Sequence, residues 1–258
     1  MTDLVLVDVS DGVQTVRMNR PDKKNALTTA MYAVMADALD AANASKDIKC
    51  TVFLGVPGCF TGGNDIPDFI AAASGASGLS DTPVLRFLRG LALSEKPILA
   101  GVDGVAVGLG TTMMFHCDLV FATENALFKA PFLDLGLIPE AGSTLIGPAL
   151  MGQQRSFELL CYGEPFSAED GRLAGFVSRV VGSAELEDKV REAALRVAAK
   201  PPEALQMSRR LMRGDTDAIL ARIEQETASF GHRLKSAEAR EAFTAFMEKR
   251  PADFSKLA

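Results

Sequence analysis

The sequence has little of what builds a metal centre. It contains two histidines and four cysteines, and no two cysteines form a CxxC pair; the cysteines are Cys50, Cys59, Cys117 and Cys161. Structural zinc sites need four Cys or His ligands at short spacings, so no metal site is expected. Scattered cysteines of this kind are typical of free, mostly buried thiols in a reducing cytoplasm.

Long apolar runs are also absent, so we expect no membrane span. The first residues, MTDLVLVDVSDG, are acidic and alternate in polarity, which is unlike a signal peptide. At the other end, Ser255-Lys256-Leu257 would be a peroxisomal address only if it were terminal, and Ala258 follows it. These features predict a cytoplasmic chain with no membrane partner.

Basic residues are outnumbered by acidic ones. The 33 Asp and Glu exceed the 27 Lys and Arg, which gives a net charge of −6. An acidic surplus disfavours nucleic acid as a partner, although a local basic patch could still bind an anionic ligand. With 258 residues, 48% of them hydrophobic, the chain can bury one sizeable core.

Strand and helix patterns mix in the first two-thirds of the chain. Alternating residues at 4–9 and 13–18 predict a hairpin, and Thr28 precedes a helical pattern. The apolar positions of that helix are Met31, Val34, Met35, Leu39 and Ala42, and further strands are predicted at 50–55, 98–102 and 119–122. Residues 71–81 are small and polar and are expected to be mobile.

Towards the end, only helices are expected. Amphipathic patterns cover residues 185–200, 203–213, 216–230 and 237–249. Ser167 with Asp170 resembles a capping box at the start of an earlier helix. We place a boundary near Gly182, which divides the chain into a mixed part, residues 1–182, and a helical part, residues 183–258.

Glycine-rich segments follow two of the predicted strands, where backbone amides are free to bind a ligand. A dinucleotide site is excluded, because Gly108-Leu109-Gly110 begins like GxGxxG but Met113 stands at the third glycine position. Neither a P-loop nor a GxSxG nucleophile elbow is present. The segments must therefore serve another kind of site.

Four segments carry a resemblance to a known family. They are Asn19–Leu27 (NRPDKKNAL), Phe60–Ile66 (FTGGNDI), Lys96–Gly110 (KPILAGVDGVAVGLG) followed by Cys117-Asp118, and Leu135–Gly142 (LGLIPEAG). In this order they resemble the signatures of the enoyl-CoA hydratase/isomerase, or crotonase, family. Within it, the chain resembles the peroxisomal-type Δ3,Δ2-enoyl-CoA isomerases.

The resemblance implies an α/β fold, a crotonase-like spiral of ββα repeats with a C-terminal helical region. Residues 1–182 would bind coenzyme A and carry catalysis, and residues 183–258 would serve oligomerisation and cover the active site. The resemblance also implies an acyl-CoA thioester as substrate, a role in fatty acid β-oxidation, no separate cofactor, and a homotrimer or hexamer.

An oxyanion hole made of the backbone amides of Asn64 and Leu109 is implied as well. Such donors stabilise the enolate that forms when a proton leaves the carbon beside a thioester. Contacts with coenzyme A are implied for Lys24, Ala26, Leu27, Gly62, Gly63, Asn64, Asp65, Ile66 and Leu109. Lys23 and Lys24 could equally be a solvated surface pair.

The acid/base group decides the reaction. The resemblance implies that a hydratase of this family uses two glutamates. In this chain the corresponding positions hold Thr112 and Phe132, neither of which can transfer a proton as a carboxylate does. Hydratase activity should therefore be poor. Glu140 instead lies among apolar neighbours, which raise the pKa of a carboxyl and suit it to proton transfer. In the isomerases that this pattern resembles, one glutamate moves a proton from C2 to C4.

Other roles stay open for several acidic residues. Glu140 could merely cap the helix expected near Gly142. Asp65 is expected to hold the oxyanion loop and Asp118 to fix a helix end, while the direction of Asp134 is undetermined.

At the C-terminus, Lys249 with Phe243 and Phe246 either reaches over coenzyme A or belongs to an ordinary packed helix. For the whole chain, the first hypothesis is isomerisation of a 3-enoyl-CoA by Glu140 with the amides of Asn64 and Leu109. The alternatives are an enoyl-CoA hydratase or another crotonase-family reaction, and a non-catalytic acyl-CoA-binding protein.

Overall fold

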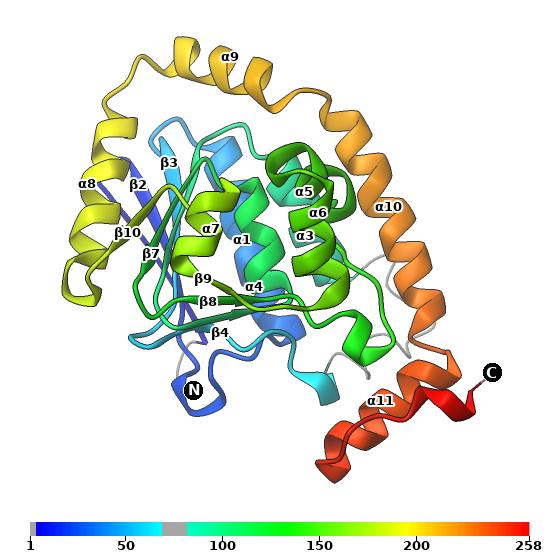
Figure 1. Ribbon diagram of the computed structural model, residues 1–258. Coiled ribbons are helices and arrows are strands. Elements are labelled where there is room, and N and C mark those ends of the chain that lie inside the picture. The colour runs from blue at the N-terminus through cyan, green and yellow to red at the C-terminus, as the bar shows by residue number, and fades with distance from the viewer. Residues whose placement is uncertain (1–3, 69–81, 258) are drawn as a thin grey trace.

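The computed structural model describes residues 4–68 and 82–257. The stretch 71–81, predicted to be mobile, lies outside these residues. Two β-sheets form the centre of the molecule, and helices cover them (Figure 1). In the described ranges, no helix is long and apolar enough to cross a bilayer.

The larger sheet has six strands in the order β1-β2-β3-β5-β7-β10. They are β1 (Val5–Ser10), β2 (Val13–Met18), β3 (Cys50–Leu54), β5 (Ile98–Val102), β7 (Leu119–Thr123) and β10 (Arg179–Val181). β1 and β2 form the predicted antiparallel hairpin, and the other pairs are parallel. The three further strands predicted from the sequence are confirmed.

A second sheet holds four short strands in the order β4-β6-β8-β9. They are β4 (Cys59–Thr61), β6 (Val105–Val107), β8 (Leu127–Lys129) and β9 (Phe166–Ser167). The pairs β3/β4, β5/β6 and β7/β8 each send one strand to each sheet, so the chain winds as a spiral of repeats. The predicted crotonase-like α/β spiral is confirmed.

Helix α1 (Thr29–Ala44) begins where the sequence predicts, because the Thr28 hydroxyl accepts a hydrogen bond from the Met31 amide at 3.3 Å. Its buried face includes Tyr32 and packs against α3 (Pro83–Leu93). Val34, predicted on this face, is 38% exposed. It lies about 120° around the helix from the centre of the buried face.

Short helices connect the repeats: α4 (Leu109–Thr112), α5 (Ser143–Met151), α6 (Gln153–Phe157) and α7 (Ala168–Ala174). The Ser167–Asp170 capping box predicted at the start of α7 is confirmed, since each side chain bonds the other residue's amide. α4 directly follows β6, α5 and α6 lie between β8 and β9, and α7 directly follows β9.

Four longer helices follow β10, namely α8 (Leu186–Ala198), α9 (Pro202–Arg213), α10 (Thr216–Arg233) and α11 (Ala237–Glu248). In Figure 1 they run from the left edge across the top and down the right side. α8 covers one face of the larger sheet, where Leu186 and Val190 pack against Leu99. α10 packs against α3 and α5. The contact of α10 with α3 forms part of the pocket described below.

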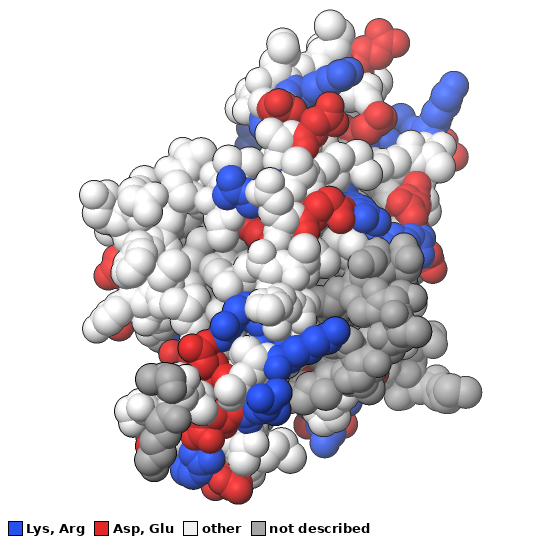
Figure 2. Space-filling model, turned by 90° about the vertical axis from the view of Figure 1, so that its right-hand side faces the viewer, with Lys and Arg blue, Asp and Glu red and all other residues white. Residues whose placement is uncertain are grey.

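Figure 2 shows the face that carries α10 and α11, with both signs of charge close together. Several of these charges form ion pairs, among them Arg89 with Glu224 and Arg250 with Glu241. The described part of this face therefore presents no broad surface of a single sign.

Helix α9 is attached through a buried arginine. Arg209 is 7% exposed, and its Nε donates to both carboxylate oxygens of Asp118 at 2.8 Å. Asp118 also accepts from the Ile98 amide at 2.8 Å. The expectation that Asp118 fixes a helix end is therefore wrong. It fixes the start of β5 and holds α9, a partner distant in sequence.

We predict that Arg209→Ala destabilises the fold, because it leaves the Asp118 carboxylate without its cation. The free energy of unfolding should fall by about 3 kcal/mol. Urea denaturation of the variant and the parent measures this difference. Arg210→Ala, which removes an exposed arginine from the same helix, is the matched control. A loss of equal size in both variants would contradict the anchoring role.

Candidate functional site

The loop after β4 presents a backbone amide at Asn64. The Leu27 amide donates to the Gly63 carbonyl at 2.8 Å, and the Asp65 amide donates to the Leu27 carbonyl at 2.9 Å. These two bonds form a parallel bridge between Leu27 and Asn64. The bridge uses the Gly63 carbonyl and the Asp65 amide, so the N–H of Asn64 itself points away from Leu27. This N–H has no acceptor among the described residues.

A second amide is presented by Leu109, the first residue of α4. The first N–H of a helix has no partner within the helix, and in the described part of the chain this one has no other acceptor. The Leu109 side chain is buried in the core, so only its backbone is available to a ligand. The helix begins at Leu109 itself and changes to a 3-10 turn at Met113.

The two amides lie at neighbouring strand ends. β4 and β6 are parallel, so their C-terminal ends lie at the same edge of the sheet. At Gly63, φ is +91°, and a β-carbon there would lie 3.3 Å from the Val107 carbonyl oxygen. The loops thus approach backbone to backbone, which requires glycine. Two unpaired N–H groups on adjacent loops can bind an oxyanion.

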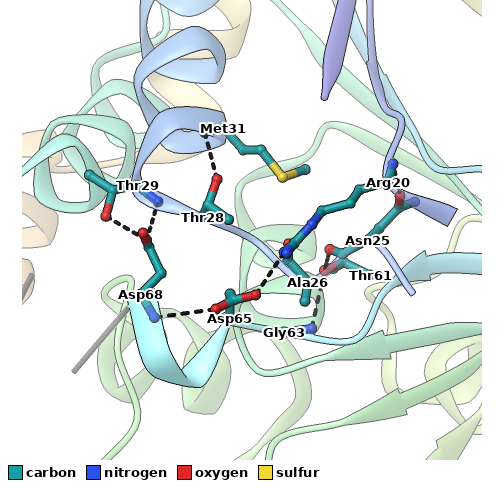
Figure 3. A network of polar contacts seen from close by, with 10 residues as sticks. All are labelled: Arg20, Asn25, Ala26, Thr28, Thr29, Met31, Thr61, Gly63, Asp65 and Asp68. Carbon is teal, nitrogen blue, oxygen red and sulfur yellow. Dashed lines mark hydrogen bonds and ion pairs between the residues drawn. The ribbon is translucent and has the colours of Figure 1, made fainter. Parts of the chain in front are cut away.

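Charged side chains hold the first loop (Figure 3). An oxygen of Asp65 accepts from Arg20 at 2.8 Å, and Arg20 also donates to the Ala26 carbonyl at 2.8 Å. The other oxygen of Asp65 accepts from the Asp68 amide at 3.2 Å. The hydrogen bond from Arg20 lowers the pKa of Asp65. Asp65 is thus an ionised carboxylate engaged on both oxygens, as expected of a residue that holds the loop.

A buried asparagine ties this loop to the strand before it. The Asn25 side-chain amide donates to the carbonyls of Cys59 and Phe60, at 3.2 and 3.0 Å. The Thr61 hydroxyl donates to the Asn25 carbonyl at 2.6 Å and accepts from the Gly63 amide at 3.1 Å. The backbone just before Asn64 is therefore fixed without a ligand.

Glu140 is a partly buried carboxyl with one hydrogen-bond donor. The Thr112 hydroxyl donates to its Oε1 at 2.7 Å. Burial raises the pKa of Glu140 to about 8; the Thr112 bond opposes this shift and the charge of Glu226 adds to it. A carboxyl with such a pKa can accept and release a proton near neutral pH.

The helix-cap role considered for Glu140 is wrong. Its side chain bonds Thr112, whereas a carboxylate of α10, Glu226, accepts from the amides of Gly142 and Thr144 at the start of α5. Glu226 was not predicted. Its partner amides lie more than 80 residues away in sequence, so no local pattern announces it.

A small pocket joins Glu140 to the first loop. Its volume is about 30 Å³, and its lining combines apolar side chains of α3 and α10 with a few polar ones: Asn64, Thr82, Val84, Leu85, Leu88, Glu140, Thr227 and Phe230. A larger groove of about 830 Å³ lies between α8 and β10 and includes none of the predicted site residues.

Tyr32 is a further polar group beside Asn64 that the sequence did not single out. Its hydroxyl donates to the side-chain oxygen of Asn64. Burial raises the pKa of Tyr32, and the charge of Glu140 raises it further. Its position among the apolar residues of α1 was the signal, since a hydroxyl on a buried helix face needs a partner.

Other predicted residues lie around this centre. The Lys23 and Lys24 side chains are exposed, and the Lys24 carbonyl accepts from the Gly62 amide at 2.7 Å. Phe132 is buried. Asp134 is exposed and lies 3.8 Å from the Lys129 ammonium, so it is directed to solvent.

The α11 residues divide between surface and core. Phe246 and Lys249 are exposed, and Phe243 is half-buried against the core. The exposed pair remains available to a ligand or a partner, whereas Phe243 packs.

A sequence profile of the enoyl-CoA hydratase/isomerase family matches residues 8–256. The chain belongs to this family. Enoyl-CoA delta isomerase 2 of Rattus norvegicus is 32% identical over 251 residues, which are 96% of this chain but only 64% of that protein. The 1,2-epoxyphenylacetyl-CoA isomerase of Escherichia coli (strain K12) is 31% identical over 265 residues, 99% of each chain.

Solved structures agree with this membership. An enoyl-CoA hydratase/isomerase from Pseudoalteromonas atlantica superposes with a TM-score of 0.92 and is 36% identical, over 98% of this chain and 100% of that one. This crotonase-family chain is therefore an acyl-CoA enzyme, and the site described above lies in the fold common to that family.

We predict that Glu140 makes the fold less stable as the pH rises towards 8. Its pKa is about 8 in the folded chain against an ordinary 4.5, so between these values the folded state binds more protons than the unfolded state. Stability then falls with rising pH. In Glu140→Gln the fall should be shallower, by up to about 1.4 kcal/mol per pH unit. Urea unfolding from pH 5 to 9 checks this; equal slopes would contradict it.

Proposed function

We propose that the chain is a Δ3,Δ2-enoyl-CoA isomerase, which moves the double bond of a 3-enoyl-CoA to the 2,3 position. The observation that carries the proposal is a proton-transfer group in the same pocket as Asn64, whose backbone amide has no acceptor among the described residues. Glu140, with a pKa of about 8, lines one pocket with Asn64, and the Asn64 and Leu109 amides are on adjacent loops.

In the proposed reaction, the Asn64 and Leu109 amides donate hydrogen bonds to the thioester oxygen. The Glu140 carboxylate removes a proton from C2, and the electrons form a dienolate whose oxygen charge the amides stabilise. The Glu140 carboxyl then returns the proton at C4, and the double bond is left between C2 and C3. One base is sufficient because the proton that it removes is the proton that it delivers.

The surroundings of Glu140 suit this role. The Thr112 hydroxyl engages one carboxylate oxygen and leaves the other for the substrate. Val84, Leu85 and Leu88 line the pocket with apolar surface, which excludes water and keeps the base unsolvated. The pocket of about 30 Å³ must widen between α3 and α10 to admit an acyl chain.

Hydration is the weaker alternative because it uses a second carboxylate. The two positions where hydratases of the family have glutamates hold Thr112, which donates to Glu140, and Phe132, which is buried. Among the described residues that line the pocket, Glu140 is the only carboxyl. This arrangement supports proton transfer and gives no second group to activate water.

The remaining assignments complete the proposal. Residues 1–182 would form the catalytic part and residues 183–258 the cover and oligomer contacts of a cytoplasmic homotrimer or hexamer in fatty acid β-oxidation, with no separate cofactor. Coenzyme A would lie against the loops that carry Lys24, Ala26, Leu27, Gly62, Gly63, Asn64, Asp65, Ile66 and Leu109.

We predict that Glu140→Gln lowers the kcat for 3-hexenoyl-CoA isomerisation roughly 10³-fold, because an amide cannot accept the C2 proton. Affinity for acyl-CoA should stay within about twofold, since the amides are untouched. The increase in conjugated enoyl thioester absorbance measures the rate. Asp134→Asn, which neutralises an exposed carboxylate in the same segment, should keep wild-type turnover. An active Glu140→Gln enzyme would remove the proposed base.

A second measurement separates the alternatives. Incubated with crotonyl-CoA, the enzyme should leave the conjugated thioester almost unchanged while it isomerises 3-hexenoyl-CoA. Rapid loss of the conjugated absorbance would establish hydration instead. Binding of acyl-CoA without conversion of any enoyl substrate would favour a non-catalytic binding protein.

A further inference from the structure

Helix α10 places a buried carboxyl beside the segment that carries Glu140. Glu226 is 3% exposed, although glutamates are rarely buried to this extent without a role. Its helix neighbours Ile223 and Phe230 are buried, and Thr227 and Phe230 line the pocket with Glu140. The same helix face therefore forms a wall of the pocket and contacts the chain just after Glu140.

Both oxygens of Glu226 are engaged by donors from that segment. Oε2 accepts from the Gly142 amide at 2.6 Å, and Oε1 accepts from the amide and hydroxyl of Thr144 at 3.0 and 2.6 Å. Arg222, one turn before Glu226, donates to the Thr144 hydroxyl at 3.0 Å. Burial raises the pKa of this carboxyl, and the three donors and the nearby cation oppose that shift.

The turn that these bonds hold is strained. Ala141 has a φ of +64° and Gly142 a φ of +70°. The left-handed region costs a residue with a side chain about 1 kcal/mol or more, and it persists only where contacts impose it. On the other side of the turn, the Nε2–H of His116 donates to the Ala141 carbonyl at 2.6 Å. Glu226 and His116 thus bond the two sides of the Ala141–Gly142 peptide group, in a bend that begins at Glu140.

We propose that Glu226 is a positioning residue for the proton transfer by Glu140, and the inference rests on the function proposed above. By holding the amides of Gly142 and Thr144, Glu226 fixes the strained bend and so directs the Glu140 carboxyl to the pocket beside Asn64. Its three donors leave it no free oxygen for proton transfer, so it acts through Glu140.

The charge of Glu226 has a second effect on Glu140. A like charge disfavours ionisation, and it contributes to the raised pKa of Glu140, after burial. Two groups face this pair, Arg222 and Tyr32. Burial raises the pKa of Glu226, and the charge of Arg222 opposes this shift. Burial also raises the pKa of Tyr32, and the charge of Glu140 adds to it. Glu226 therefore makes Glu140 a stronger base as well as a fixed one.

Two variants separate these effects. Glu226→Gln keeps the length of the side chain and removes its charge. Its NH₂ group replaces one acceptor oxygen, so it cannot accept a hydrogen bond from the Gly142 or Thr144 donors that it faces. We expect kcat to fall roughly 10- to 100-fold with KM within about twofold. The acid limb of the pH–rate profile, near 8 in the parent, should move to lower pH because the like charge is gone. Glu226→Asp keeps the charge but shortens the side chain, so kcat should fall while the limb stays.

The matched control is Glu224→Gln, which removes the same charge from an exposed position of α10. It should leave kcat and the pH profile unchanged. If Glu226→Gln does not fold by circular dichroism, Thr144→Val replaces it, since it removes one donor and keeps the charge; kcat should fall with KM unchanged.

The outcomes distinguish this inference from the proposed function. Suppose that Glu140→Gln is inactive but Glu226→Gln keeps the wild-type kcat and pH profile, or Thr144→Val keeps the wild-type kcat. The positioning role of Glu226 would then be overturned, and the proposed base would stand. A Glu140→Gln enzyme of wild-type activity would overturn the proposed base, and the positioning role with it. Effects of equal size in Glu224→Gln would show that only the general charge of α10 matters.

Discussion

The site depends on one carboxyl that is kept out of water without a cation beside it. Desolvation disfavours the charged form of Glu140 and raises its pKa to about 8, which makes it a useful base and an unfavourable group to bury. Among the described residues, the Thr112 hydroxyl alone compensates directly. In the proposed reaction, the rest of the structure has to hold this side chain in place and supply hydrogen-bond donors where negative charge develops.

The two parts of the chain meet these needs separately. Parallel strands β4 and β6 end side by side, which brings the amides of Asn64 and Leu109 onto adjacent loops. The base is held from the C-terminal helices instead. Arg213 of α9 donates to the His116 carbonyl at 2.7 Å, and His116, kept neutral because burial lowers its pKa to about 4, donates to Ala141. On this view, α9 and α10 both support the proposed reaction, and α10 also lines the pocket.

Much of this could be predicted from the sequence because the decisive patterns are local. The hairpin, the Thr28 cap and the C-terminal helices follow from periodicity and capping, and four motifs gave the family and the loops around Asn64 and Leu109. The second sheet was missed because its strands have two or three residues, too few for a period. Asp118 was misread because its partner, Arg209, lies 91 residues away.

The same distance explains why Glu226 was missed, and its contrast with Glu140 shows how environment assigns a role. Glu140 is partly buried at the start of the turn, Glu226 is fully buried on α10 against it, and burial raises the pKa of each. Glu226 has three donors, so each oxygen is committed and the group can only hold structure. Glu140 has one donor and a pocket in front of it, so one oxygen stays free to take a proton. The number of donors at each carboxylate, rather than the residue type, therefore separates the proposed base from its proposed support.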